Sequence, residues 1–253
     1  MLNQSKNQAQ THIIIPARLK STRFPEKILA NIHGKTLMQC TYEQALRSEL
    51  GKVIIAVDDL EIKKLAESFG AQTCMTEISH ISGTARLSEV CEKLKLNPES
   101  IILNWQVDEP LLAIKNAQQV VKLLDNKKDC QVATLCEEIK DLEALKNTNI
   151  VKVVFDHCGR ALYFSRAPIP WTRDGSPDFS NKNHFRHLGL YAYKTSFLLN
   201  YKSMPECFLE TLEGLEQLRF LFAGYKIAIE QAQEESIPGV DTPEDLLRVL
   251  NLF

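Results

Sequence analysis

HIIIPA, at residues 12–17, is a short run of β-branched side chains that ends at a proline. Such a run predicts a strand that is buried on both faces of a sheet and gives way to a loop at Pro16. Two similar runs follow, KVIIAVDD at residues 52–59 and SIILNWQVDEP at residues 100–110, and acidic side chains close each of them. The three runs predict the central strands of one sheet.

Helices are predicted between and after these strands, over about 36–48, 60–69, 84–94 and 113–124, with AQTCMT at 71–76 as a further strand. Strand and helix therefore alternate, which predicts an α/β fold with a doubly wound, mostly parallel sheet and right-handed crossovers. Ligands of such sheets lie outside the carboxyl ends of the strands. We expect residues 16–27, Asp58, Asp59 and residues 106–109 to share that edge.

The second half of the chain has a different pattern. Residues 131–139, 150–156 and 160–166 are spaced as antiparallel strands, with a turn at HCGR before the last. A long loop is predicted over 167–184, a strand that returns to the sheet over 186–194, and helices near Phe197 and over 212–222. A last strand at 226–232 precedes a helix that opens at 241–245. These segments predict a small antiparallel insertion beside the main sheet.

Composition places the chain among ordinary globular proteins. With 253 residues, 44% hydrophobic, it is long enough to bury a substantial core, so we predict a polar, disordered tail at 1–11 and one domain over 12–253. The formal net charge of -2 argues against nucleic acid or an anionic membrane as partner.

Cysteine usage and the N-terminus bear on location. The seven cysteines form no CxxC pair, which suits free thiols in a reducing compartment. The polar start is unlike a signal peptide, and no stretch approaches the ~20 apolar residues of a membrane span. We therefore expect a soluble, cytoplasmic protein.

The loop PARLKSTRFPEK, at 16–27, concentrates positive charge beyond the first strand. Four basic side chains stand among hydroxyl groups and backbone amides there, an arrangement that can hold a triphosphate and withdraw charge from a leaving diphosphate. The alternative is a solvated basic turn. Neither a Walker loop nor a GxGxxG motif is present, so kinase, GTPase and dehydrogenase functions lose their main support.

Asp108 and Asp241 are candidate ligands for a hard cation. Asp108 follows an apolar strand just past Gln106, and Asp241 stands at the start of the last helix. Mg²⁺ prefers one or two carboxylates together with phosphate oxygens. The alternatives are a turn at the strand end for Asp108, and for Asp241 an ordinary helix N-cap three residues before Glu244.

A further set of polar residues could face a substrate: Arg166, His187, Tyr191, Glu216 and Gln217. Each is weak evidence alone, since a histidine on an apolar strand is more often a structural residue. Sequence reasoning leaves both interpretations open.

Taken together, PARLKSTRFPEK, SGTARL, NWQVDEP, NIVKVVFD, ALYFSRAPIPW, FRHLGLYAY, LEQLR and GVDTPEDL resemble the CMP-Kdo synthetase family. These are the 3-deoxy-D-manno-octulosonate (Kdo) cytidylyltransferases of lipopolysaccharide assembly. The resemblance runs in order from about residue 13 to residue 249. It implies a nucleotide-diphospho-sugar transferase-like fold, attack of the sugar's anomeric hydroxyl on the α-phosphate of CTP, and a requirement for Mg²⁺.

The resemblance also implies roles for single residues. The catalytic residues would be Arg18, Lys27, Asp108 and Asp241, of which Asp108 and Asp241 hold the metal. CTP would be bound by Arg18, Ser21, Arg23, Lys27, Ser82, Arg86 and Gln106. The sugar would contact Gln106, Arg166, His187, Tyr191, Glu216 and Gln217. The subregion at about 130–194 would supply a homodimer contact and part of the sugar pocket.

Three positions depart from the family pattern. Ala85 replaces the glutamate of SGTER, Val107 replaces the glycine of QGDEP, and Glu26 stands where the loop commonly has glycine. Val107 adds bulk beside a metal carboxylate, which could narrow the site or lower activity. Two alternatives stay open: the same reaction on a related acid sugar of the 8-amino-Kdo or sialic acid type, and a catalytically weak nucleotide-binding paralogue.

Overall fold

The structure, a computed structural model, describes residues 9–19, 24–80, 82–173, 175 and 177–253. Ser21 and Arg23, which were expected to bind the triphosphate, lie outside these ranges, as do residues 1–8. Strand β1 (Thr11–Ala17) begins inside the predicted tail, and the N–H of Gln10 donates to Ser100 Oγ at 3.0 Å. The predicted domain boundary at residue 12 therefore falls too late.

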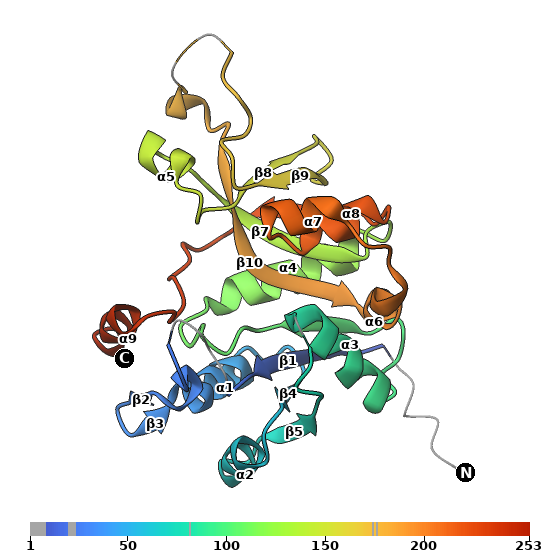
Figure 1. Ribbon diagram of the computed structural model, residues 1–253, viewed down its shortest axis with the longest axis vertical. Coiled ribbons are helices and arrows are strands. Elements are labelled where there is room, and N and C mark those ends of the chain that lie inside the picture. Colours follow the sequence, from blue (N-terminus) through green and yellow to red (C-terminus); the bar gives the residue numbers. More distant parts are fainter. Residues whose placement is uncertain (1–8, 20–23, 81, 174, 176) are drawn as a thin grey trace.

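A central sheet runs through the molecule in the order β11-β7-β10-β6-β1-β4-β5 (Figure 1). Its other strands are β4 (Lys52–Val57), β5 (Gln72–Met75), β6 (Ile101–Asn104), β7 (Val132–Glu138), β10 (Phe185–Lys194) and β11 (Ile227–Gln231). Strand β10 is antiparallel to its neighbours β6 and β7, whereas the other adjacent pairs are parallel. The predicted doubly wound, mostly parallel sheet is confirmed.

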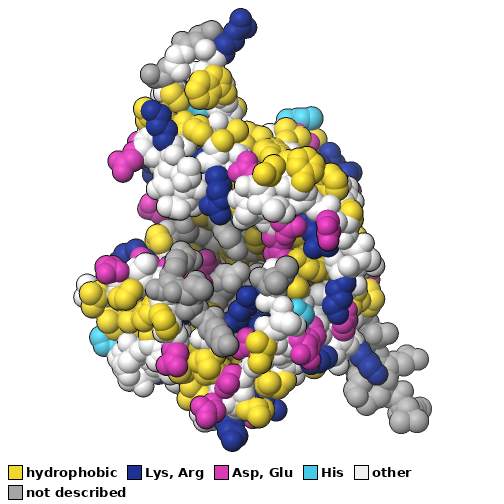
Figure 2. Space-filling view, in the orientation of Figure 1, with side chains coloured by type: hydrophobic (Ala, Val, Ile, Leu, Met, Phe, Trp, Pro, Cys, Tyr) yellow, Lys and Arg dark blue, Asp and Glu magenta, His cyan; other side chains and the backbone are white. Residues whose placement is uncertain are grey.

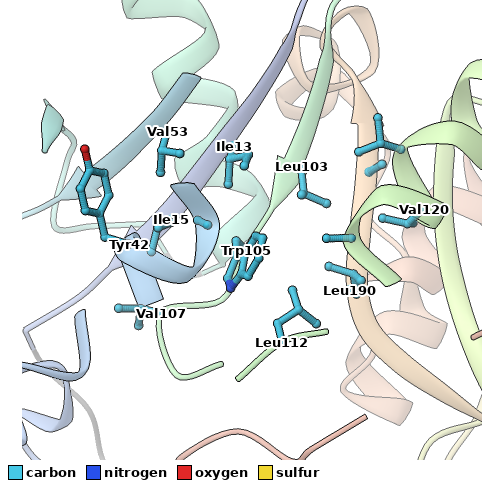
Figure 3. Close-up of a cluster of buried hydrophobic side chains, with 14 of the residues drawn as sticks. Ile13, Ile15, Tyr42, Val53, Leu103, Trp105, Val107, Leu112, Val120 and Leu190 are labelled. Atoms are coloured by element: carbon cyan, nitrogen blue, oxygen red, sulfur yellow. The ribbon is translucent and has the colours of Figure 1, made fainter. Parts of the chain in front are cut away.

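Both faces of this sheet are buried, because successive side chains of a strand point to opposite faces. Ile13 and Ile15 pack in a cluster that includes α1, α2 and α4, whereas Ile14 packs in a cluster with α3, α6 and α8. Figure 3 shows the first cluster, in which Trp105 lies between Ile15 and Leu112. Burying one such side chain contributes about 1.5–3 kcal/mol. The helices are α1 (Leu37–Arg47), α2 (Leu60–Ser68), α3 (Gly83–Lys93), α4 (Ile114–Asn126), α6 (Thr195–Leu199) and α8 (Gln217–Phe222).

An antiparallel hairpin of β8 (Lys152–Phe155) and β9 (Ala161–Ser165) extends β10 beyond the main sheet. The loop predicted over 167–184 follows it, with one short 3₁₀ turn, η2 (Phe179–Asn181), and α5 (Leu142–Lys146) lies beside it in Figure 1. Strand β7 does not open this insertion as predicted. It lies inside the main sheet because Val132, Ala133, Leu135 and Cys136 are buried on both of its faces.

The helix predicted over 212–222 is two helices. Gly214 ends α7 (Phe208–Glu213) with a φ of 61°, the left-handed conformation in which glycine has no Cβ penalty. Helix α8 begins at Gln217, so Glu216 lies at the turn between the two helices.

The remaining elements are short. They are η1 (Lys27–Leu29), β2 (Asn31–Ile32), β3 (Lys35–Thr36), η3 (Tyr201–Ser203) and α9 (Pro243–Leu250). Of the helices in the described ranges, none has the length and apolar character needed to cross a membrane. All seven cysteines lie in those ranges as free thiols, and each except Cys158 is buried.

Candidate active site

Lys27 joins the two carboxylates that were predicted to hold a metal. Its Nζ donates to Asp108 Oδ2 at 2.5 Å, to Asp241 Oδ1 at 3.0 Å and to the carbonyl of Val240 at 3.2 Å. Burial alone would lower the pKa of Lys27, but the two carboxylates outweigh it and raise that pKa. The lysine is therefore a cation fixed between two anions.

Asp241 accepts a hydrogen bond from Lys27, whereas another residue caps the last helix. Thr242 is the N-cap of α9, and it forms a capping box with Asp245. The interpretation of Asp241 as an N-cap is therefore wrong. The preceding residues pass close to the Asp108 turn: the N–H of Val240 donates to the carbonyl of Asp108 at 2.8 Å, and a Cβ at Gly239 would lie 2.9 Å from that oxygen.

The turn that carries Asp108 is fixed from below by the core. Trp105 Nε1 donates to the carbonyl of Glu109 at 3.1 Å, and Thr41 Oγ1 donates to that of Val107 at 2.7 Å. The N–H of Glu109 donates to the carbonyl of Gln106 at 3.1 Å, so the predicted strand-end turn exists together with the site. Burial, with Asp108 and Asp241 nearby, raises the pKa of Glu109 to about 8, so this carboxyl is largely neutral at pH 7.

Val107 does not crowd the carboxylates as expected. Its side chain is buried in the cluster of Figure 3, near Trp105 and Ile15. The β-branched side chain packs in the core, and the residue is 7% exposed. Replacing it by glycine would leave a cavity.

A second group of charges lies at the ends of β1 and β4. Arg86, expected beside the cytidine, is fully buried on α3 and donates from Nη2 to Asp58 Oδ2 at 2.9 Å and from Nη1 to Thr76 Oγ1. Asp58 also accepts the N–H of Leu19 at 3.4 Å. Arg86 thus positions Leu19 through Asp58, and the predicted shared edge of the sheet is confirmed for the described residues of the first loop.

Arg18 lies next to this group. Burial and the nearby Arg86 lower the pKa of the Arg18 guanidinium, while Asp58 and Glu216 act in the opposite direction. A guanidinium remains charged at any physiological pH. Arg18 is therefore a half-buried cation at the carboxyl end of β1, as the phosphate hypothesis requires.

Glu216 connects this group to the expected cytidine segment. Its carboxylate accepts hydrogen bonds from Thr84 Oγ1 at 2.7 Å and from the Tyr201 hydroxyl at 2.6 Å. That hydroxyl also lies 3.3 Å from Ser82 Oγ, which caps α3 by accepting the N–H of Ala85. Sequence reasoning missed Thr84 and Tyr201; Thr84 lies inside a recognised block, but no local pattern indicates Tyr201.

Arg166 braces the turn between α7 and α8. Its Nε donates to the carbonyl of Glu213 at 2.7 Å and its Nη1 to that of Thr148 at 2.9 Å. Lys152, fully buried, donates to three carbonyls, one of them that of Arg166. A lysine inside the apolar run IVKVVF was a sequence signal that could have revealed this support.

His187 and Tyr191 lie together on β10. His187 Nε2 is 2.9 Å from Thr134 Oγ1, and burial lowers the pKa of His187 to about 3, so the imidazole is neutral. The two rings pack with their centroids 5.2 Å apart. Within the described part of the chain, the buried Tyr191 hydroxyl has no hydrogen-bond partner, which suits a ligand contact.

The groups adjoin one another. Glu109 and His187 line one pocket of about 170 Å³, and Glu216 is close enough to contribute to a raised pKa of Tyr191. Figure 2 shows basic and acidic side chains around a recess in the middle of the view. The two remaining predicted residues are Gln106, in the loop after β6, and Gln217, buried at the start of α8. A separate pocket of about 600 Å³, between β8 and residues 170–185, shares no residue with this site.

Comparison with known proteins gives consistent results. The model of a family described as cytidylyltransferase matches residues 12–227. The 3-deoxy-manno-octulosonate cytidylyltransferase of Francisella tularensis subsp. novicida is 49% identical over 247 residues, which cover 97% of this chain and 99% of that protein. The protein of the same name from Legionella pneumophila (strain Corby) is 46% identical over 96% of each chain.

Solved structures agree with these relatives. A CMP:2-keto-3-deoxy-manno-octonic acid synthetase in complex with CTP has a TM-score of 0.88 at 38% identity, covering 96% of this chain and 98% of that one. A cytidylyltransferase from Leptospira borgpetersenii serovar Hardjo-bovis has a TM-score of 0.64 at 16% identity and covers 97% and 88%. The second likeness concerns the fold alone.

Proposed function

The chain belongs to the cytidylyltransferase family, and on that premise we propose that it couples CTP to Kdo, giving CMP-Kdo and diphosphate for lipopolysaccharide synthesis. The observation that carries the proposal is the pair of carboxylates, Asp108 and Asp241, brought onto one cation at the carboxyl edge of the sheet. The choice of Kdo as the sugar is supported by the relatives named for this reaction, which align over nearly the whole chain.

The proposed reaction is an in-line displacement at phosphorus. The anomeric hydroxyl oxygen of Kdo forms a bond to the α-phosphorus of CTP, the bond from that phosphorus to the bridging oxygen breaks, and diphosphate leaves as the hydroxyl proton is released. Such a step mainly needs positioning and neutralised charge. Arg18 and Lys27 supply positive charge for the triphosphate, and the protein needs no nucleophile of its own.

We propose Mg²⁺ as the metal, held by Asp108 and Asp241. The residues fit this ion, because the Lys27 ammonium shows that one cation can reach both carboxylates. In proteins Mg²⁺ usually has one or two carboxylate ligands plus substrate phosphates, and the described residues contain no cluster of three or more candidate ligands. When bound, Mg²⁺ would neutralise charge on the phosphates. With Asp108 and Asp241 holding Mg²⁺, Lys27 would be available to the triphosphate.

The sugar subsite is proposed at Arg166, His187, Tyr191, Glu216 and Gln217. A neutral imidazole and a protonated phenol can exchange hydrogen bonds with sugar hydroxyls without adding charge. The guanidinium of Arg166 suits the sugar's carboxylate. Arg166 directly follows β9, His187 and Tyr191 lie on β10, and Glu216 and Gln217 lie where α8 begins. The contact of Arg166 with the carbonyl of Glu213 joins the end of β9 to the end of α7.

We also propose that the enzyme is a cytoplasmic homodimer. Seven free thiols, six of them buried, fit a reducing compartment. Leu162 on β9 is 60% exposed and Trp171 is 80% exposed, so the subregion at 130–194 presents apolar side chains that a second copy would cover.

Diphosphate release from CTP and Mg²⁺ with Kdo, 8-amino-Kdo or sialic acid tests the function. We expect release with Kdo, and none with any of these sugars would refute the proposal. Asp108→Asn should lower turnover by at least about a hundredfold while the fold stays intact. Asp125→Asn, the same change in a surface ion pair, is the matched control. An unimpaired Asp108→Asn would refute the metal assignment.

A further inference from the structure

The carboxylate of Glu216 is held by two elements other than its own. Thr84 lies on α3 and Tyr201 on η3, and each donates its hydroxyl to a different oxygen of Glu216. Although Glu216 stands at the N-cap position of α8, its side chain makes no capping hydrogen bond. The carboxylate is therefore directed toward the start of α3, the segment expected beside the cytidine.

Tyr201 is itself fixed in place. The residue is 5% exposed, and the guanidinium carbon of Arg219 lies 5.1 Å from the ring centroid. Arg219 in turn donates to the carbonyls of Met204 and Pro205. Burial and Glu216 raise the pKa of Tyr201, so its hydroxyl keeps the proton that it donates. The hydroxyl lies within hydrogen-bond distance of both Glu216 and Ser82.

We propose that Tyr201 and Thr84 are positioning residues that couple the two substrate sites, by holding the sugar-binding carboxylate of Glu216 on the cytidine segment at Ser82 and Thr84. The inference rests on the proposed function. CTP binding at that segment would set the carboxylate in place for the sugar. Without either hydroxyl the carboxylate would lose a hydrogen bond that holds it on this segment, so nucleotide binding there would no longer place it for the sugar.

Sugar affinity with and without nucleotide tests the coupling. Kdo binding is measured by calorimetry alone and with saturating α,β-methylene-CTP and Mg²⁺, because the methylene bridge prevents diphosphate release. We expect the nucleotide to tighten Kdo binding of the wild type by about fivefold or more. In Tyr201→Phe this ratio should fall toward one, while the affinity for the CTP analogue alone changes by less than about twofold.

Thr84→Val is the second variant and should reduce the same ratio, so the test stands if Tyr201→Phe unfolds. Tyr225→Phe removes a phenol from the rim of the same apolar cluster and should keep the wild-type ratio. An unchanged ratio in both variants, or the absence of coupling in the wild type, would overturn the inference. Failure of the proposed function is separate, because it appears as a wild type that releases no diphosphate from CTP and Kdo.

Discussion

Lys27 separates two carboxylates that would otherwise repel each other. Its Nζ lies 2.5 Å from Asp108 and 3.0 Å from Asp241, and its side chain is only 13% exposed. A cation in this place stabilises the site before any metal or nucleotide arrives, but it also competes with a metal for the same oxygens. Lys27 thus stabilises the site without ligand and lowers its affinity for the metal.

Lys27→Met should therefore have effects of opposite sign. Hydrogen bonds to charged groups contribute about 1.5–3 kcal/mol, so affinity for Mg²⁺ alone should rise roughly tenfold, while turnover falls by about a hundredfold or more. Calorimetric titration with MgCl₂ in the absence of CTP measures the first effect and diphosphate release the second. Lys35→Met, which removes an exposed lysine paired with Glu43, should alter neither. Weaker Mg²⁺ binding in Lys27→Met would show that the ammonium does not compete.

Glu26 has a backbone conformation that favours glycine, the residue expected at this position from the resemblance. Its φ of 54° and ψ of 24° lie in the left-handed region, just before η1 and Lys27. A residue with a Cβ pays about 1–2 kcal/mol there. Glu26 thus opposes the backbone conformation that leads into η1.

Glu26→Gly should be more stable than Glu26→Ala by about 1 kcal/mol, since only glycine relieves the backbone and part of the gain is lost to a more flexible unfolded chain. Urea unfolding of the two variants measures the difference. Equal stabilities would mean that the left-handed conformation costs nothing here.

Single residues were predictable where charge stands at a strand end. The contact between Lys27 and Asp108 could be predicted because parallel strands bring their carboxyl ends to one edge, and Asp241 was a candidate from its position at the start of the last helix. The contact of Tyr201 with Glu216 could not be predicted, because it depends on packing against Arg219 and on a carboxylate 15 residues away. Arg86 was placed near the cytidine, but only the structure shows that it acts through Asp58.

At the scale of elements, the segment before α9 closes the site by approaching the Asp108 turn very closely. Gly239 permits this, because a Cβ there would lie 2.9 Å from a backbone oxygen that cannot move aside. Gly239→Ala should therefore displace Asp241 and lower turnover by about tenfold or more, with a smaller loss of stability. Full activity in Gly239→Ala would refute this account.

Helix α3 anchors the loop that precedes it through Glu89. Burial opposes the charged form, but hydrogen bonds from Lys93, the N–H of Glu77 and His80 outweigh it and lower the pKa of Glu89 to about 2. A lowered pKa stabilises the fold above the unfolded value of 4.5, and this contribution is lost as the pH falls from there toward 2.

Glu89→Gln should thus lose up to about 3 kcal/mol of unfolding free energy at pH 7 and much less near pH 3. Urea unfolding across this range measures the difference from wild type. Glu92→Gln, on the same helix but paired at the surface with Lys202, should show a small loss. A pH-independent loss in Glu89→Gln would contradict the assigned cause.

Elements were predictable from sequence where one apolar run makes one strand or helix. The runs that contain Ile13, Val53 and Ile102 are buried on both faces, and each became a central strand. Strand β7 was misplaced because a run such as VATLC has no feature that distinguishes a hairpin strand from a central one. The break at Gly214 was missed because an isolated glycine in an apolar helical pattern is also tolerated inside helices.

The whole molecule presents two differently built parts. The main sheet with its helices carries the carboxylates, and the part with β8, β9, α7 and α8 carries Arg166 and Glu216 (Figure 1). Figure 2 shows hydrophobic side chains gathered over the second part. The proposed dimer would cover apolar surface of this part and steady the sugar subsite.

Leu162→Asp should weaken such a dimer by roughly 3 kcal/mol, because it buries an unpaired charge. Size-exclusion chromatography with light scattering at micromolar concentration should then give twice the mass of one chain for the wild type and the mass of one chain for the variant. Leu247→Asp places the same change on α9, where leucine is 63% exposed, and should remain dimeric. A monomeric wild type would refute the dimer.

The position of Asp241 has a consequence for biosynthesis. Strand β11, the last of the sheet, ends at Gln231, whereas Asp241 and α9 come later in the chain. Because a chain is synthesised from its N-terminus, the strands of the sheet are all made before Asp241 is added. A nascent chain that has reached Gln231 therefore contains these strands but only one of the two carboxylates.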